Sequence, residues 1–411
     1  MSPGRPRDGA RDRELCEPDR ALELVLAHAP AGRVVERALP DAVGLWLGAD
    51  LPAQLDQPPF TRALMDGFAV RVADAGRAVE LRGEAAAGHP ASRAVEPGTA
   101  IAISTGAPCP PGTESVVKLE DTEREAGSVR LPASITPQQH VQPAGSLRRA
   151  GEAVVPAGTR LTPLGLAAAI ASGCSTARVW EPPSLAIITT GDELRPAGER
   201  LARAEIPDSN GPMLLAMARA LGLAAPLELH AADDPAALGA VLDLARDVDL
   251  VVLSGGVSVG AHDLVPRALA ALGARVLLHG VRQQPGKPLL CATRGAQLLF
   301  GLPGTPLGSH LGFHRYVAAA IRQSLGAPVA PRLRRGRLLS PLRAHGERTL
   351  FRLVRAELAA DGWRIDPLRW RGSSDLAGPA LANGYCRFEP GEHDLEAGAL
   401  LDWEPLTTQD D

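Results

Sequence analysis

Hydrophobic and polar positions divide the chain into stretches of different period. Arg20–Ala29 carries apolar residues at helical spacing and stops at Pro30, and Arg33–Ala38 is strand-like. From residue 56 to 137 short β-like runs follow one another between Gly and Pro residues, a pattern typical of a small all-β domain. These runs are Gly67–Val72, Ala78–Arg82, Ala100–Ser104, Ser115–Leu119 and Ser128–Leu131.

The pattern becomes mixed again after the β-like runs. Residues 151–161 resemble a turn and a strand, and Pro163–Ser172 has a helical pattern that Gly173 closes. We expect this segment, residues 138–182, to fold back on residues 18–55. The β domain would then be an insertion in a discontinuous domain.

Residues 183–326 alternate strand and helix patterns, which predicts an α/β domain with a parallel sheet. The expected strands cover residues 185–188, 249–253 and 298–300, and the expected helices cover residues 212–221, 235–246, 263–272 and 306–325. After residue 327 the pattern is β-like again. There Ala360-Asp361-Gly362 predicts a hairpin turn between two alternating runs.

Composition narrows the function classes. The chain has 411 residues and a net charge of −4, which disfavours a general nucleic-acid binder. Five scattered cysteines without a Cys-x-x-Cys pair indicate free thiols in a reducing cytosol, with neither a zinc site nor a disulfide framework. The charged start lacks an apolar stretch, so we expect a disordered segment over residues 1–17, a cytoplasmic protein and no membrane association.

Three loops that follow expected strands carry the candidate chemistry: Thr189–Glu193, Ser254–Gly260 and Gly301–Pro306. Ligands of open parallel sheets bind outside the carboxyl ends of the strands, where such loops converge. Glycines let backbone amides approach an anion, and helix N-termini favour negative charge. One such loop is as often structural as functional, but three in one domain predict a site for a phosphate or a pterin phosphate.

Acidic residues recur at these loops, at Glu193, Asp233, Asp234 and Asp263. Carboxylates beside phosphates commonly bind Mg²⁺. Asp233 or Asp234, before Pro235, could equally cap a helix, as could Asp208 or Ser209 before the helix expected from residue 212.

Pro285-Gly286-Lys287-Pro288 is a restricted turn that presents one lysine. Lys287 is therefore a candidate anion ligand, and a solvated surface charge is the alternative interpretation.

Several enzyme classes lack their motifs. The chain has no Gly-x-x-x-x-Gly-Lys-Ser/Thr, no dinucleotide fingerprint and no histidine pair at zinc-binding spacing. Gly256–Gly260 matches Gly-x-Ser-x-Gly, so an α/β-hydrolase with Ser258 as nucleophile is the alternative from sequence pattern. No Asp and His follow it at convincing strand ends.

Taken together, the motifs resemble one family. In chain order they are Leu64–Val70, Ser104–Ala107, Thr190–Leu194, Asp208–Asn210, Ser254–Gly260, Pro285–Pro288 and Gly301–Pro306. The sequence resembles the molybdopterin molybdenumtransferase family (MoeA-type, similar to the C-terminal domain of gephyrin) over nearly the whole chain after Pro18.

The resemblance implies an α/β plus all-β multidomain fold. Its parts would be a discontinuous elongated domain (18–55 and 138–182), an inserted β domain (56–137), a doubly wound molybdopterin-binding α/β domain (183–326) and a C-terminal β-barrel (327–408). It implies a homodimer in which the β domain of one subunit contributes to the cleft of the other. It also implies that molybdate is inserted into adenylylated molybdopterin with Mg²⁺, and that AMP is released. The molybdopterin adenylyltransferase and cofactor-accepting enzymes would be partners.

The resemblance also implies roles for particular residues. Asp66 and Thr105 would act from the β domain, and Lys287 would act from its turn. Glu193, Asp233 and Asp263 would serve Mg²⁺ and phosphate handling. The remaining cofactor contacts would be Thr190, Gly191, Ser209, Asn210, Ser254, Gly255, Gly256, Ser258, Gly260, Pro303 and Gly304. Arg352 and Ser373 would contact molybdate, with Arg348 as the alternative to Arg352.

Four positions depart from the family pattern: Ala63, Ala153, Ala261 and Thr305. They keep open a weak or inactive paralogue that acts as a molybdopterin-binding scaffold, and a variant that prefers tungstate. An adenylyltransferase is a third interpretation, which rests on the α/β domain alone.

Overall fold

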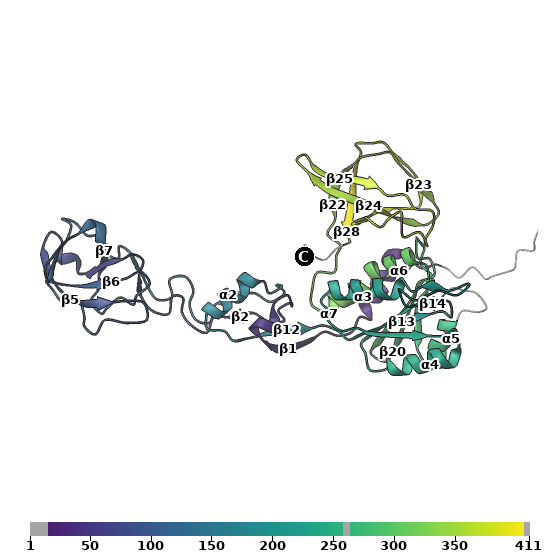
Figure 1. Cartoon of the computed structure of the whole chain (residues 1–411), viewed down its shortest axis with the longest axis horizontal. Helices are drawn as coiled ribbons and strands as arrows, with labels where there is room; N and C mark the ends of the chain where they lie inside the picture. Colours follow the sequence, from purple (N-terminus) through teal and green to yellow (C-terminus); the bar gives the residue numbers. More distant parts are fainter. Residues whose placement is uncertain (1–14, 258–263, 407–411) are drawn as a thin grey trace, which may run out of the picture. The chain divides into compact units, whose positions relative to one another are not determined.

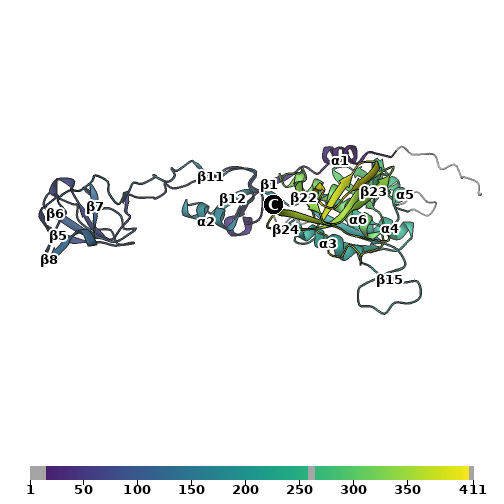
Figure 2. The ribbon, with the colours of Figure 1, turned by 90° about the horizontal axis from the view of Figure 1, so that it is seen from above.

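The computed structural model describes residues 15–257 and 264–406. The chain divides into two compact units, one of residues 36–179, here called the β unit, and one of residues up to 35 and from 180 onward, here called the α/β–barrel unit. Strands β1 (Arg33–Ala38) and β12 (Thr176–Glu181) pair and carry the chain between the units. The two units are coloured by sequence in Figures 1 and 2.

The β unit contains a six-stranded sheet in the order β7-β4-β6-β5-β9-β8. Along β4, Phe68 and Val70 pack in one hydrophobic cluster and Ala69 in another, because successive strand residues point to opposite faces. All five predicted β-like runs form strands of this sheet. Its strands are β4 (Gly67–Val70), β5 (Ala78–Ala85), β6 (Thr99–Ile103), β7 (Ser115–Lys118), β8 (Glu123–Glu125) and β9 (Ser128–Arg130).

The rest of the β unit consists of short pairs and one helix. The predicted helix is confirmed as α2 (Pro163–Ala171), and the Thr162 hydroxyl caps it by accepting from the Gly165 N–H at 3.0 Å. Strand β2 (Leu51–Pro52) pairs with β11 (Ala153–Val155), and β3 (Arg62–Ala63) pairs with β10 (Val141–Gln142). The 3₁₀ turns are η1 (Leu39–Ala42), η2 (Val72–Asp74) and η3 (Leu119–Asp121).

The α/β domain is built on a six-stranded sheet in the order β16-β13-β17-β21-β20-β18. The first four strands are parallel and the last two are antiparallel to their neighbours. The strands are β13 (Leu185–Thr190), β16 (Leu227–Ala231), β17 (Leu250–Ser254), β18 (Arg275–His279), β20 (Leu290–Arg294) and β21 (Gln297–Leu302). A separate short pair, β14 (Leu194–Arg195) and β15 (Ile206–Pro207), follows β13.

Helices cover both faces of this sheet, which confirms the doubly wound fold (Figure 1). On one face α4 (Pro235–Leu244) and α5 (Leu264–Ala271) pack against alternate residues of β13 and β17. On the other lie α3 (Asn210–Ala220) and α6 (Pro306–Gly312), and a π-helical turn, η4 (Phe313–Val317), joins α6 to α7 (Ala318–Ser324).

The C-terminal region is a closed five-stranded barrel, because β24 pairs with β26 as well as with β25. The predicted turn joins β24 to β25, with Ala359 opposite Gly362. Barrel strands are β22 (Arg334–Leu338), β24 (Thr349–Ala359), β25 (Gly362–Pro367), β26 (Gly384–Phe388) and β28 (Leu400–Pro405). A side pair consists of β23 (Leu342–Gly346) and β27 (Gly391–Leu395), and β19 (Gln283–Gln284) extends the barrel sheet beside β24.

The N-terminal helix α1 (Pro18–Ala27) corrects two predictions. It packs against α7, and the Ser324 hydroxyl donates to the Pro30 carbonyl at 2.8 Å, so residues 18–35 belong to the α/β–barrel unit and not with residues 36–55. An apolar helix face shows that a helix is buried but not against what. Cys16 also departs from the disorder predicted over residues 1–17, because it forms a bridge to Val281. Among the described residues, no helix is long and apolar enough to span a membrane.

Candidate functional site

Two adjoining pockets lie in the α/β–barrel unit. The first, here called the carboxyl-end pocket, has a volume of about 540 Å³ and lies outside the carboxyl ends of the parallel strands. The second, here called the barrel-side pocket, has a volume of about 590 Å³ and is lined by residues of both the α/β domain and the barrel. Glu193, Gly256 and Gly304 line both. Each is large enough for part of a sizeable ligand.

The carboxyl-end pocket lies where the strand order reverses. After β13 the chain crosses to β16 on one side, and then to β17 on the other side of β13. Loops that leave these strands in opposite directions open a crevice for a ligand. The predicted residues that line this pocket are Thr190, Gly191, Glu193, Asn210, Asp233, Ser254, Gly255, Gly256 and Gly304.

Glycine is required at the loop that follows β17. Gly255 has a φ of +106°, and a Cβ there would lie 2.6 Å from Thr190 Oγ1 and 2.7 Å from the Thr190 carbonyl oxygen. The neighbouring Gly256 has a φ of +63°. The predicted close approach of backbone therefore exists, between the loops that follow β13 and β17.

A buried amide joins three loops of the pocket. Asn210 Nδ2 donates to Ser254 Oγ and to the Gly304 carbonyl, both at 2.9 Å, and Ser254 Oγ lies 3.1 Å from Ser309 Oγ. Asn210 Oδ1 is buried and has no hydrogen-bond partner in the described part of the chain, and the same holds for Thr190 Oγ1. Buried polar atoms are nearly always paired, so both atoms are positioned to bond a ligand.

Some of the acidic loop residues cap helices, and others line the pocket. Asp234 caps α4 by accepting from the Ala237 N–H at 2.8 Å, and Asp208 accepts from the Gly211 N–H at 3.0 Å at the start of α3. Asp233 lines the pocket, and its N–H donates to Asp192 Oδ1 at 3.1 Å. Ser209, predicted as a cofactor contact, lines neither pocket and makes no capping bond.

The carboxylates fit a magnesium ion only together with a ligand. Glu193 and Asp233 both line the carboxyl-end pocket, whereas no group of three or more His, Cys, Asp or Glu suits a metal among the described residues. Mg²⁺ is often held by one or two carboxylates together with substrate phosphates, so these two residues match that pattern. The third predicted ligand, Asp263, lies outside the described residues, as do Ser258 and Gly260.

The barrel-side pocket is lined by Lys287, Arg348 and Ser373, which come from three separate segments. Gln283 contacts the Lys287 turn from the protein interior. Its side chain is fully buried, and its Nε2 lies 3.5 Å from the Gly286 carbonyl. The Ser373 carbonyl accepts from the Leu307 N–H at 3.0 Å, which ties the barrel loop to α6. The predicted Pro303 and Gly304 also line this pocket.

Arg352 does not line either pocket, whereas Arg348, its alternative, lines the barrel-side pocket. The Arg352 guanidinium lies over the ring of Trp370 at 4.4 Å, and burial followed by the nearby Arg369 lowers its pKa. Trp370 itself lines the barrel-side pocket. Arg348 directly precedes β24 and Arg352 lies near its start, so sequence position could not distinguish the one that lines the pocket.

Asp66 and Thr105 lie together in the β unit. Asp66 Oδ1 accepts from the Thr105 N–H at 2.6 Å and from its hydroxyl at 2.9 Å. These hydrogen bonds, the backbone one first, lower the pKa of Asp66, so its exposed carboxylate stays charged.

The pocket residues that sequence reasoning missed include two with large polar or aromatic side chains. Arg267 of α5 lines the carboxyl-end pocket, and Trp370 lines the barrel-side pocket. A tryptophan in a polar loop of a chain with only 3% aromatic residues was a usable signal for Trp370. Arg267 had none beyond its place after the glycine-rich loop.

The positions that depart from the family pattern lie in different surroundings. Thr305 lines the barrel-side pocket, Ala63 is buried in β3, and Ala153 begins β11. Ala261 lies outside the described residues. Thr305 is thus the described departure with direct access to a pocket of the α/β–barrel unit.

Comparison with known proteins agrees with this architecture. Residues 16–173 match the MoeA N-terminal region (domain I and II), and residues 186–323 match a probable molybdopterin binding domain. Molybdopterin molybdenumtransferase 2 of Mycobacterium tuberculosis is 33% identical over 92% of this chain and 96% of its own length. A molybdopterin molybdenumtransferase of Nostoc is 35% identical over 69% of each chain.

Solved structures give the same result. Two structures of a molybdopterin biosynthesis MoeA protein from Pyrococcus horikoshii superpose with TM-scores of 0.84 and 0.77, at 27% and 25% identity, and cover 96% and 95% of this chain and 99% and 100% of theirs. These matches replace the hydrolase interpretation. The chain belongs to the molybdopterin molybdenumtransferase family of molybdenum cofactor biosynthesis.

Proposed function

We propose that this protein inserts molybdenum from molybdate into adenylylated molybdopterin and releases AMP. The observation that carries the proposal is the meeting of two chemically different pockets at Glu193. One is an amide- and glycine-lined crevice at the carboxyl ends of parallel strands, and the other is lined by cations. A reaction between a phosphate-bearing pterin and an oxyanion needs both beside each other.

The carboxyl-end pocket supports binding of the pterin nucleotide. Positive-φ glycines expose backbone, and the unpaired Asn210 Oδ1 and Thr190 Oγ1 can bond ring or ribose groups. We propose that Glu193 and Asp233 hold Mg²⁺ against the phosphates. When bound, the ion would neutralise their charge and make the phosphoanhydride easier to cleave.

The barrel-side pocket supports binding of molybdate. A tetrahedral oxyanion needs cationic and hydroxyl donors, and Lys287, Arg348 and Ser373 line the same pocket. We propose that these three residues hold the oxyanion beside the pterin, with Arg352 acting through Trp370. No side-chain nucleophile is required.

We also propose that the enzyme works in the cytoplasm as a homodimer in which Asp66 and Thr105 serve the cleft of a second copy. Mixing two inactive variants, Asp66→Ala and Lys287→Ala, tests this. Mixed dimers would contain one unaltered site, so part of the activity should return. Continued inactivity of the mixture would contradict the shared site.

The main test is AMP release by the purified protein with adenylylated molybdopterin and Mg²⁺. Molybdate should stimulate release and tungstate should do so less. Bound pterin without AMP release would indicate a scaffold that lost turnover, and faster release with tungstate would reassign the substrate. Consumption of ATP with molybdopterin would instead indicate the adenylyltransferase reaction.

A further inference from the structure

The N-terminal helix contacts both parts of the molecule that enclose the barrel-side pocket. We propose that Asp19 of α1 is a positioning residue, which fixes the barrel against the α/β domain so that the barrel-side pocket keeps its shape for an oxyanion. Asp19 lines neither pocket and would act through other residues. The identity of the oxyanion as substrate rests on the proposed function.

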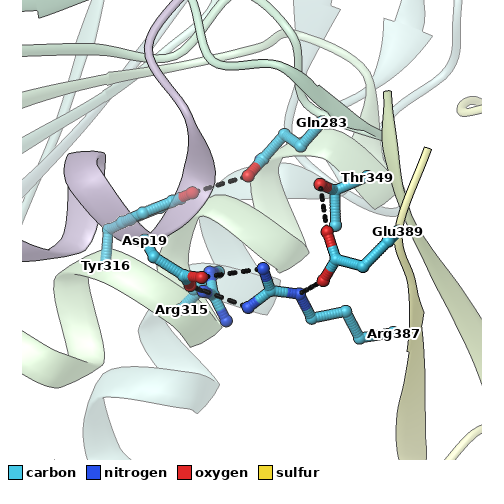
Figure 3. A network of polar contacts seen from close by, with 7 residues as sticks. All are labelled: Asp19, Gln283, Arg315, Tyr316, Thr349, Arg387 and Glu389. Atoms are coloured by element: carbon cyan, nitrogen blue, oxygen red, sulfur yellow. Dashed lines mark hydrogen bonds and ion pairs between the residues drawn. The ribbon is translucent and has the colours of Figure 1, made fainter. Parts of the chain in front are cut away.

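Asp19 is shared by two arginines from different domains (Figure 3). Arg315 of the π-helical turn η4 donates to Asp19 Oδ1 at 2.5 Å. Arg387 of barrel strand β26 donates to both carboxylate oxygens, at 2.7 and 2.8 Å. A two-bond contact between guanidinium and carboxylate fixes orientation as well as distance. The carboxylate therefore ties one helix, one helical turn and one strand together.

One branch from this contact leads to the Lys287 turn. Tyr316, next to Arg315, donates its hydroxyl to Gln283 Oε1 at 2.6 Å (Figure 3). Gln283 in turn supports the Gly286 carbonyl, directly before Lys287. A displacement of the π-helical turn would reach the lysine through two fully buried side chains.

The other branch leads to Arg348. Arg387 also pairs with Glu389 at 2.8 Å, and Glu389 accepts a long hydrogen bond of 3.5 Å from the Thr349 hydroxyl. Thr349 follows Arg348 and pairs with Gln283 where β24 meets β19. The two branches thus end on the paired strands β19 and β24, one branch near Lys287 and the other near Arg348.

Burial makes this contact different from an ordinary surface ion pair. The Asp19 side chain is 60% exposed, but that of Arg315 is only 9% exposed. Exposed pairs contribute little to stability. Without the Asp19 carboxylate, however, the nearly buried guanidinium of Arg315 would lie beside that of Arg387 with no shared anion between them. The arginines would separate, and the barrel would shift with them.

The helix itself is held independently of Asp19. The Cys16 N–H donates to the Gly280 carbonyl at 3.1 Å, the Arg282 N–H donates to the Cys16 carbonyl at 2.8 Å, and Glu17 pairs with Arg282 at 2.7 Å. An Asp19→Asn variant should therefore keep α1 in place and lose only the charge. Asp19→Glu keeps the charge, so this variant should retain most of the wild-type affinity for molybdate.

Steady-state kinetics of the full chain test the proposal. Asp19→Asn should raise the KM for molybdate roughly tenfold, while the KM for the pterin substrate changes less than about twofold. Asp402→Asn is the matched control, because it removes the exposed barrel pair with Arg335 at 2.8 Å, and it should change neither KM. Equal changes in both KM values, no change in either, or failure of Asp19→Glu to restore molybdate KM would overturn the proposal.

Amide hydrogen exchange provides a readout that needs no catalysis. In Asp19→Asn, exchange should rise over residues 283–287 and 348–353 and stay unchanged over β13 and β17. If the wild type releases no AMP, the proposed function fails, but this exchange pattern would still support the positioning role of Asp19. Unchanged exchange over residues 283–287 would reject it in either case.

Discussion

The carboxyl-end pocket and the barrel-side pocket adjoin each other but are built in opposite ways. The first is formed by loops that follow strands of one sheet and by the helices after them, so its residues come from one α/β region. The second collects Lys287, Arg348 and Ser373 across the join between two domains. The shape of a pocket within one domain depends on local backbone conformation. The shape of a pocket between two domains depends on how those domains pack against each other. The two should therefore respond differently to substitution, as the following predictions state.

The largest effect should come from Glu193, which lines both pockets. Glu193→Gln should slow AMP release by roughly 100-fold or more, because it removes one of the two carboxylates proposed to hold Mg²⁺ against the phosphates. The exposed Glu199, in the loop after β14, is the matched control. Rates would be measured by chromatography of AMP at saturating Mg²⁺. Similar rates for the Glu193 and Glu199 variants would mean that Glu193 takes no part in the reaction.

Local geometry of the carboxyl-end pocket can be broken at Gly255. Gly255→Ala should lower the free energy of unfolding by about 2–4 kcal/mol, because the φ of +106° and the contact with Thr190 both exclude a Cβ. Gly239→Ala in α4, where an added Cβ meets nothing within 4 Å, should instead stabilise by about 0.5–1 kcal/mol. Urea denaturation measures both. A neutral Gly255→Ala would show that the loop relaxes.

The barrel-side pocket can be dissected with its two neighbouring arginines. Arg348→Ala should weaken molybdate binding by about 10- to 50-fold, the loss of roughly one hydrogen bond to a charged group. Arg352→Ala should weaken it less, because the Arg352 guanidinium lies over Trp370 and outside the pocket. Calorimetric titration with molybdate ranks them, and Arg335→Ala serves as control. The opposite ranking would restore Arg352 as the direct ligand.

The stability of the chain should also change with pH through His310. His310 Nδ1 lies 2.8 Å from the Tyr385 hydroxyl, between α6 and the barrel, and burial lowers the pKa of His310 to about 4. An unfolded histidine titrates near about 6.5. The stability contribution is therefore present above that pH and is lost as the pH falls toward 4, by about 1–3 kcal/mol.

This pH effect should be absent from His310→Gln. Urea unfolding at pH 7 and pH 5 would compare the variant with the wild type. If the free energy of unfolding falls equally between pH 7 and pH 5 in the variant and the wild type, another group controls the loss of stability in acid. A barrel-side pocket that loses molybdate at pH 5 before the carboxyl-end pocket loses pterin would sharpen the contrast between them.

The contrast also explains which parts of the site could be predicted from the sequence. Gly255 and Glu193 follow predicted strands, so their convergence was predictable from the α/β pattern, whereas β16, the strand before Asp233, was not predicted. Arg348 and Trp370 could not be placed, because both lie in loops of the barrel and nothing local sets which distant segment such a loop meets. The choice between Asp233 and Asp234 as helix cap likewise needed the backbone, since both stand before the same proline.

By itself the sequence determined many of the helices and strands, the α/β plus all-β class of the chain and the family to which it belongs. These follow from periodicity, turn residues and ordered motifs, which are short-range properties. Only the tertiary structure placed α1 with the α/β–barrel unit, brought Asp19 to two arginines about 300 or more residues away in the chain and set Arg348 in the pocket in place of Arg352. Such contacts depend on packing between distant segments, for which an amphipathic pattern specifies burial but no partner.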